Sequence, residues 1–88
     1  MRITVNRHAM LRARERGDIW TTKEIKRLYY DATPLKPSLR RRLGLHNERL
    51  GNGRWKIVRR NGNHIFVVDT NGHHHSLVTY INIEGIRI

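Results

Sequence analysis

Residues 54–83, which read RWKIVRRNGNHIFVVDTNGHHHSLVTYINI, decide the fold that we expect for this chain. Two Asn-Gly pairs, Asn61-Gly62 and Asn71-Gly72, separate three runs that are rich in β-branched and aromatic residues. Asn-Gly is the preferred pair in a two-residue type I′ turn, because both central residues of that turn need a positive φ. We therefore predict an antiparallel meander with strands over residues 54–60, 63–70 and 73–83.

The register of these strands follows by counting, if each turn contains two residues. Arg59 then faces His64, and His64 faces Thr79 on the third strand. Directly opposed residues share a face, so one face of the sheet would carry an apolar set and end in a polar row of these three residues. The apolar set is Trp55, Ile57, Phe66, Val68 and Leu77, and the opposite face would carry Arg54, Lys56, Arg60, Asn63, His74, Ser76 and Tyr80.

Two helices are predicted before the strands. Asn6 is a suitable N-cap for a helix over residues 6–17, with Gly17 as its stop. Thr21 and Glu24 have the spacing of a capping box, so a second helix should begin at Thr21 or Thr22 and end before Pro34.

The remaining segments carry weaker signals. We interpret residues 36–53 as a loop with room for one helical turn, and we expect Gly85 to break the chain before a short apolar tail, residues 86–88. The fold class expected is α+β, with two N-terminal helices packed on a small antiparallel sheet of three to four strands. At 88 residues the chain should form one domain, residues 1–88.

Net charge is the strongest functional signal in the composition. Eighteen Lys and Arg residues against seven Asp and Glu residues give a net charge of +11 with histidine neutral. Such an imbalance attracts polyanions, and the predominance of arginine over lysine favours phosphate recognition, so RNA is the first candidate partner. The chain has no cysteine and no apolar run of membrane-spanning length. These absences favour a cytoplasmic protein without disulfides.

One candidate site lies on the first predicted helix. His8, Arg12 and Arg16 are four residues apart, so they share one stripe of that helix. A histidine and two arginines could supply an acid or base together with a phosphate clamp. The alternative is a solvated basic face on an amphipathic helix.

A second candidate site is the polar row of Arg59, His64 and Thr79. RNA cleavage needs a base for the 2′-hydroxyl, an acid for the leaving 5′-oxygen, and cations or donors for the phosphorane. Histidine suits either proton-transfer role, because its ordinary pKa is near 6.5. The alternative is a polar end of the sheet that is hydrogen-bonded to water or to loop backbone.

Other residues are candidates for contacts with nucleic acid. The Arg40-Arg41-Arg42 run could bind phosphates or an antagonist, and Tyr80 is the aromatic residue most expected to be an exposed stacking platform, whereas most other aromatic residues should be core. Of the histidines at 73–75, only His73 and His75 would share a face and no third ligand is specified, so we expect no metal and no cofactor. Arg54, Lys56 and Arg60, on the outer face, complete the set predicted to contact nucleic acid.

The run His8-Ala9-Met10-Leu11-Arg12-Ala13-Arg14-Glu15-Arg16-Gly17 resembles the H-A-x-x-R-x-x-E-R-G opening of small bacterial and phage toxin-like proteins, grouped with the barnase–EndoU–colicin–RelE-like ribonucleases. The Thr-Lys-Glu-Ile segment at 22–25 and the late strand around Leu77 to Ile81 look like the rest of that pattern. The resemblance skips the basic middle of the chain. It implies helices packed on an antiparallel sheet and metal-independent RNA cleavage that leaves a 2′,3′-cyclic phosphate. It also implies catalytic roles for His8, Arg12, Arg16 and the hydroxyl of Thr79.

The sequence therefore predicts a toxin-like endoribonuclease with His8 or His64 as acid or base. Its expected partners are RNA, ribosome-associated mRNA or tRNA included, and an acidic antitoxin or immunity protein. Two alternatives use the same charge without catalysis. One is a basic protein that binds nucleic acid but does not cut it, and the other is a phage-type inhibitor or regulator that docks on an acidic host protein.

Overall fold

A computed structural model describes residues 2–84 and has an α+β architecture, which confirms the expected fold class. The apolar tail expected after Gly85 lies outside the described residues. In chain order the elements are β1 (Arg2–Val5), α1 (Arg7–Gly17), α2 (Thr22–Tyr30), β2 (Thr33–Pro34), α3 (Pro37–Leu43), β3 (Glu48–Gly51), β4 (Arg54–Asn61), β5 (His64–Thr70) and β6 (His74–Asn82).

Both N-terminal helices begin where the capping residues predict. The side-chain oxygen of Asn6 accepts a hydrogen bond from the backbone N–H of Ala9 (2.8 Å), and the hydroxyl of Thr21 accepts one from the N–H of Glu24 (3.2 Å). Helix α2 ends before Pro34, as expected. Helix α1 includes Gly17, and Asp18 takes the left-handed C-cap conformation (φ 52°) in its place.

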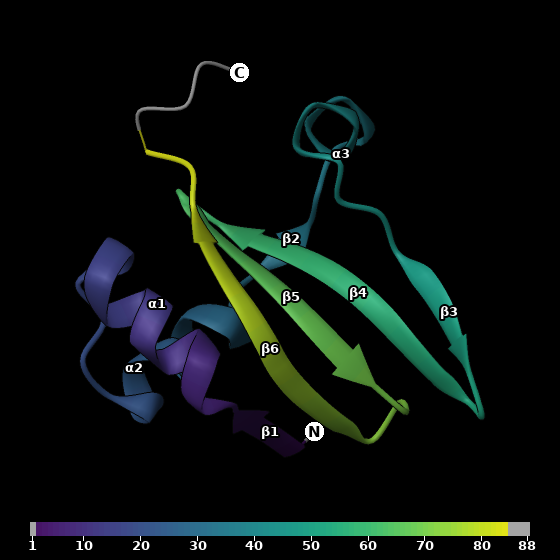
Figure 1. Cartoon of the computed structure of the whole chain (residues 1–88), viewed down its shortest axis with the longest axis horizontal. Coiled ribbons are helices and arrows are strands. Elements are labelled where there is room, and N and C mark those ends of the chain that lie inside the picture. The colour runs from purple at the N-terminus through teal and green to yellow at the C-terminus, as the bar shows by residue number, and fades with distance from the viewer. Residues whose placement is uncertain (1, 85–88) are drawn as a thin grey trace.

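The predicted meander forms the centre of a larger, mixed sheet with the strand order β1-β6-β5-β4-β2 (Figure 1). β4, β5 and β6 pair antiparallel, whereas β1 pairs parallel with β6. On its outer edge β4 pairs with two short strands, β2 near Arg59 and β3 near Trp55. The described chain therefore contains more strands than the three or four that we expected.

The interpretation of residues 36–53 as a loop is wrong over most of its length. Pro37 occupies the first turn of α3, where a missing N–H has no cost, and Gly44 ends that helix with a φ of 66°. Strand β3 follows at Glu48. Leu39 provides the reason for the helix, because it is buried in a small core on one face of the sheet.

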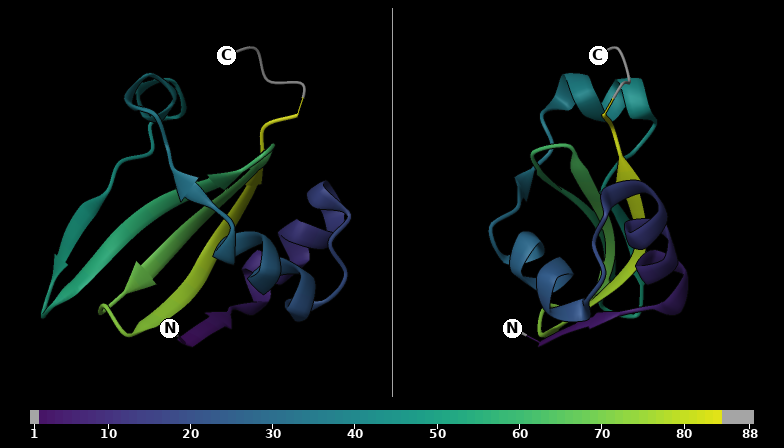
Figure 2. Two further views of the ribbon diagram at one scale, coloured as in Figure 1. Left: turned by 180° about the vertical axis from the view of Figure 1, so that it is seen from behind. Right: turned by 90° about the vertical axis from the view of Figure 1, so that its left-hand side faces the viewer.

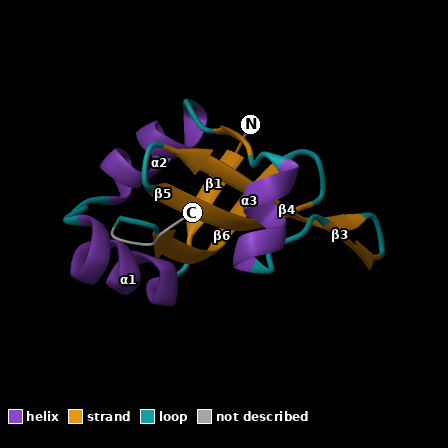
Figure 3. Cartoon of the chain, turned by 90° about the horizontal axis from the view of Figure 1, so that it is seen from above, coloured by secondary structure: helices purple, strands orange, loops and turns teal. Residues whose placement is uncertain are grey.

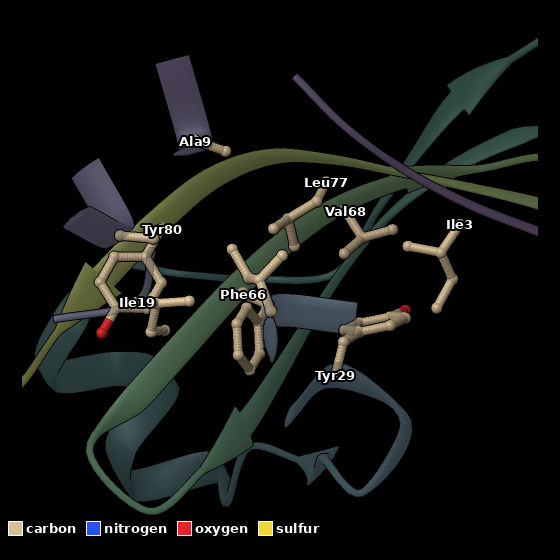
Figure 4. Close-up of a cluster of buried hydrophobic side chains, with 10 residues drawn as sticks. Ile3, Ala9, Ile19, Tyr29, Phe66, Val68, Leu77 and Tyr80 are labelled. Atoms are coloured by element: carbon tan, nitrogen blue, oxygen red, sulfur yellow. The ribbon is translucent and has the colours of Figure 1, made fainter. Parts of the chain in front are cut away.

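The helices divide between the two faces of the sheet. Figures 1 and 2 show α1 and α2 together and α3 apart from them, and Figure 3 shows the same separation from above. Helices α1 and α2 enclose the larger core, in which Phe66 lies between Tyr29 and Tyr80 (Figure 4), at ring centroid distances of 5.8 Å and 6.0 Å. Helix α3 covers a second core around Val58, Ile65 and Val67 on the opposite face.

The two hairpin turns have the predicted length but a different position. Asn61 pairs with His64, so the central residues of the first turn are Gly62 and Asn63, and only Gly62 has a positive φ (59°). That pattern fits a turn with glycine first, rather than type I′. In the second turn the N–H of Asn71 likewise donates to the carbonyl of His74 (3.3 Å). Each asparagine thus precedes the two central residues of its turn instead of being one of them, which moves the register by two residues.

A shift of two residues preserves the faces of a strand, but a bulge in β6 does not. Val67 pairs with Thr79 while Val68 pairs with Leu77, so Val78 is an extra residue in β6. Because side chains alternate along a strand, the extra residue inverts the faces of everything that follows it. Thr79 therefore lies on the α3 face, and Tyr80 lies on the α1–α2 face, each opposite to its predicted side.

Candidate functional site

An open pocket of about 520 Å³ lies where the end of α1 meets the β4–β5 turn and the end of β6. Four separate parts of the chain build it, because Leu28 of α2 also contributes, so it exists only in the folded molecule. The C-terminal turn of α1 contributes two arginines, and the β4–β5 turn contributes a histidine. The lining residues are Arg14, Glu15, Arg16, Gly17, Asp18, Leu28, Asn61, Gly62, Asn63, His64, Asn82 and Glu84.

His64 is the titratable group that the fold holds most firmly in this pocket. Its Nδ1 is hydrogen-bonded to the hydroxyl of Tyr80, which is itself buried. Burial lowers the pKa of His64 below its ordinary value of 6.5, so the imidazole is neutral at pH 7. Burial also raises the pKa of Tyr80 above 10.0, so its phenol stays protonated. When Nδ1 carries the ring proton and donates a hydrogen bond to the Tyr80 oxygen, the other ring nitrogen, Nε2, is unprotonated and can accept a proton.

Two arginines of α1 line the same pocket as His64. Arg14 and Arg16 are both exposed in the last turn of the helix. The Nδ2 of Asn82 donates to the backbone carbonyl of Arg16 (2.7 Å), which ties the end of α1 to the end of β6. Asn61 similarly donates to the carbonyl of Leu28 (2.9 Å) and ties α2 to the β4–β5 turn. These two amide contacts hold the walls of the pocket in place.

Carboxylates line the same pocket. Glu15, Asp18 and Glu84 outnumber the two arginines, so its local charge is not positive, although the protein is strongly basic. Asp18 is partly engaged, because its Oδ1 accepts a hydrogen bond from the indole N–H of Trp20 (2.7 Å). Any phosphate in this pocket would therefore have to be placed by the arginines against nearby negative charge.

The structure brings Arg16 and His64 together but separates them from the other predicted catalytic residues. His8 is exposed in the first turn of α1, about 12 Å along the helix axis from Arg16, and Arg12 lies between them without lining the pocket. Thr79 lies on the opposite face of the sheet, paired with Val67. The catalytic roles implied for His8 and Thr79 require both side chains in one site, and this expectation is wrong, because the bulge in β6 turns Thr79 away from α1.

The predicted row of Arg59, His64 and Thr79 is wrong as well. Arg59 pairs with Phe66, and His64 pairs with Asn61 and Asn82. The guanidinium of Arg59 lies over the ring of Tyr29 instead, 5.4 Å from its centroid. The causes are the position of the two turns, each of which begins one residue later than we expected, and the bulge in β6.

Arg59 belongs to a second polar group that the sequence did not suggest. The Tyr29 hydroxyl is hydrogen-bonded to Nδ1 of His75 (2.9 Å), and His75 is buried. Burial, followed by the nearby charges of Arg59, the N-terminus and His74, lowers the pKa of His75. Burial likewise raises the pKa of Tyr29. The sequence signal that could have revealed this group is strand alternation in the run His73-His74-His75. It places the first and third side chains on one face of the sheet and the second on the other.

The residues predicted to contact nucleic acid are dispersed over the molecule. Arg54 is ion-paired with Asp69, and Lys56 with Glu48 (3.3 Å). The Nε of Arg60 donates to the carbonyl of Gly62 (2.7 Å), and that of Arg40 donates to the carbonyl of Leu35 (3.0 Å). Arg41 and Arg42 are exposed on α3.

The aromatic residues are distributed differently from our expectation. Tyr80 is only 1% exposed and cannot act as an open stacking platform, because the bulge in β6 directs it into the larger core. Conversely, Trp55 is 48% exposed although we expected it on the apolar face, and Trp20 is 60% exposed although we expected most aromatic residues to be core. Trp55 does lie on the predicted face of β4, but the helices that cover the rest of that face do not bury it.

Comparison with known proteins adds no relative to this picture. No protein-family model, no curated protein and no solved structure matches the chain.

Within residues 2–84, no group of three or more potential metal ligands is placed to hold an ion. None of the helices in this part of the chain has the length and hydropathy needed to cross a membrane.

Proposed function

We propose that this protein binds RNA and cleaves it without a metal ion, as a toxin-like endoribonuclease, at the pocket between α1 and the β4–β5 turn. The observation that carries the proposal is His64, a neutral imidazole held by Tyr80 beside Arg14 and Arg16. A net charge of +11 supports RNA as the substrate, because such a field concentrates polyanions. The absence of cysteine fits a cytoplasmic enzyme.

The chemistry assigned to His64 is general-base catalysis. Nε2 removes the proton of a 2′-hydroxyl, and the resulting 2′-oxygen attacks the adjacent phosphorus. A bond forms between the 2′-oxygen and phosphorus while the bond from phosphorus to the 5′-oxygen breaks, which leaves a 2′,3′-cyclic phosphate. The departing 5′-oxygen takes a proton from water or from the imidazolium of His64. Arg14 and Arg16 stabilise the negative charge on the phosphorane.

The resemblance of residues 8–17 to toxin-like ribonucleases supports the same reaction but places its histidine elsewhere. The resemblance implies catalysis by His8, whereas the pocket geometry supports His64. We follow the geometry, because His64 has a depressed pKa, a fixed ring and a pocket that it shares with Arg14 and Arg16. A protein of this type would be held inactive by an acidic antitoxin or immunity protein that covers the basic surface.

The test is cleavage of an end-labelled RNA by the purified protein in EDTA. We expect chelator-resistant products with cyclic-phosphate ends, lost in His64→Gln and reduced in Arg16→Ala. His8→Gln is the matched control, since it removes an exposed histidine outside the pocket and should leave cleavage intact. Equal cleavage by the His64→Gln variant, or RNA that stays intact with every form of the protein, would refute the proposal.

A second candidate function is RNA binding without cleavage. The three carboxylates that line the pocket favour it, because they oppose the close approach of a phosphate to His64. The same experiment distinguishes the two functions. A binding protein would retain the labelled RNA at every pH between about 5 and 8, where histidine titrates, and would leave it uncut.

A further inference from the structure

The hairpin of β3 and the start of β4, residues 48–56, extends beyond the rest of the sheet, and we call it the β3–β4 arm (Figures 1 and 3). All four residues of β3 are exposed. A positive φ at Asn52 (52°) and at the two glycines beside it forms the tight tip. The arm thus projects side chains away from both cores.

Trp55 is the most unusual side chain on the arm. It is 48% exposed, and the neighbouring Leu50 is 46% exposed. A tryptophan side chain adds most to folding stability when it is buried. An exposed tryptophan on a projecting hairpin therefore indicates a contact surface rather than a role in packing. Arg49 pairs with Trp55 across the two strands, and its guanidinium lies 5.9 Å from the centroid of the indole ring. The guanidinium and the indole therefore form a cation–π contact within the arm.

The charges of the arm make Arg49 the cation that is open to a ligand. Arg54 is ion-paired with Asp69, and Lys56 is ion-paired with Glu48. The contact that the structure records for Arg49 is the ring of Trp55 rather than a carboxylate. An aromatic face beside an exposed guanidinium matches the two parts of a nucleotide, a flat base and a phosphate.

We propose that the β3–β4 arm binds single-stranded RNA by stacking a base on the Arg49–Trp55 pair. This inference rests on the proposed function and names the form of RNA that it uses. A single strand is required because the bases of a duplex already stack on one another, whereas unpaired bases can lie on aromatic rings and guanidinium planes. An acidic protein would engage the same cations and indole, since tryptophan and arginine are common at protein interfaces, so it is an outcome of the test below. The choice of RNA rests on the net charge of +11 and on an exposed aromatic ring beside a planar guanidinium.

The position of the arm relates it to the cleavage pocket. Trp55 and Asn61 stand near opposite ends of β4, six residues apart, which corresponds to about 20 Å of strand. RNA held at the arm would therefore reach His64 through nucleotides several positions away from the stacked base. The arm acts as a positioning site for RNA and contributes no group to the reaction.

The experiment measures the fluorescence of Trp55 and the affinity of the protein for a 2′-O-methyl oligonucleotide, which has no 2′-hydroxyl and cannot be cut. The chain has two tryptophans, so Trp20→Phe leaves Trp55 as the only indole. We expect the single strand to quench that fluorescence. We expect Trp55→Ala to weaken binding about 5- to 150-fold, the range for removal of one base–aromatic stack. Trp55→Phe should retain most of the affinity, and Arg49→Lys should lose part of it.

Trp20→Ala is the matched control, because Trp20 is 60% exposed but lies outside the arm. The affinity of this variant for the oligonucleotide should stay unchanged. Equal affinity of Trp55→Ala and the unchanged protein would overturn the inference, and so would equal quenching by polyglutamate, which would assign the arm to an acidic protein. Cleavage is scored separately. Quenching of Trp55 without cleavage would refute the proposed ribonuclease activity but support RNA binding by the arm. Cleavage together with full affinity in Trp55→Ala would support the ribonuclease activity but refute RNA binding by the arm.

Discussion

The hydroxyl of Tyr80 lies directly against Gly17, so closely that a Cβ added at Gly17 would stand 2.0 Å from it. This contact joins the last residue of α1 to β6 at the wall of the candidate pocket. The same hydroxyl is hydrogen-bonded to His64. The space left by one missing side chain therefore allows the tyrosine to hold the histidine.

Gly17→Ala should destabilise the protein. In the interior of an exposed helix, replacing glycine with alanine would stabilise the protein by up to about 1 kcal/mol, because alanine has the higher helix propensity. Here the added methyl group overlaps a buried ring, and overpacking of this kind costs about 1–3 kcal/mol. We expect a net loss of stability in urea unfolding. The loss should shrink in a Tyr80→Phe background, which lacks the nearest atom, and an equal loss in both backgrounds would show that the hydroxyl contact is misplaced.

Cleavage should depend on pH in a way set by His64. Its pKa lies below 6.5 because of burial, so the base is already neutral at pH 7 and raising the pH adds nothing. Initial rates should be level from neutral to mildly alkaline pH and should fall only as pH drops below the ordinary histidine range. A rate that rises through pH 7 would contradict a buried, neutral base.

Stability should also fall in mild acid because of His75. Its pKa is lowered in the folded state, first by burial and then by neighbouring positive charge. As pH falls below 6.5, the unfolded chain binds a proton that the folded protein binds less readily, so the free energy of unfolding decreases. His64 acts in the same direction. Urea unfolding at a series of pH values should show the decrease, with a smaller slope in His75→Gln than in the exposed control His8→Gln.

The exposed arginines of α3 should contribute to RNA affinity through phosphate contacts. Arg41→Ala and Arg42→Ala should each weaken binding by a similar factor for every RNA sequence, and each should reduce the salt slope by about one. Arg40 is already bonded to the carbonyl of Leu35, so Arg40→Ala should act mainly on the stability of α3. Binding measured across a range of salt concentrations tests this. Unchanged slopes in both exposed variants would exclude α3 from the RNA surface.

The β5–β6 turn should depend on the side-chain oxygen of Asn71. That oxygen accepts hydrogen bonds from the N–H groups of His73 (3.0 Å) and His74 (2.9 Å). Asn71→Ala should cost about 1–2 kcal/mol, the usual contribution of such bonds. Asn71→Asp keeps the acceptor and should cost less, and thermal unfolding of the two variants compares them. Equal losses would mean that the oxygen does not hold the turn.

Local sequence signals predicted much of the secondary structure. The caps at Asn6 and Thr21 located the two N-terminal helices, and the Asn-Gly pairs located the three central strands. These signals succeed because a cap or a turn depends on residues only a few positions apart. Helix α3 was missed because its main support, burial of Leu39 against the far face of the sheet, is a tertiary contact.

The candidate site was predicted less well. Arg16 and His64 do share a pocket, but Asn82, which ties its walls together, was absent from the predicted set, and Tyr80 was predicted as an exposed stacking platform rather than as the buried partner of His64. Residues 77–83 carry apolar side chains at both odd and even positions, so strict alternation could not be assigned to one face. The sequence contained this ambiguity but no local feature that resolved it.

By itself, the sequence determined the α+β composition, the ends of α1 and α2, the central hairpins and the strong positive charge. The tertiary structure alone decided which side of the sheet each residue of late β6 occupies. A one-residue bulge has little local signature, and it is stabilised by what it achieves at a distance, the burial of Tyr80 against Gly17 and Phe66. That single inserted residue moved Thr79 away from α1 and placed Tyr80 beside His64.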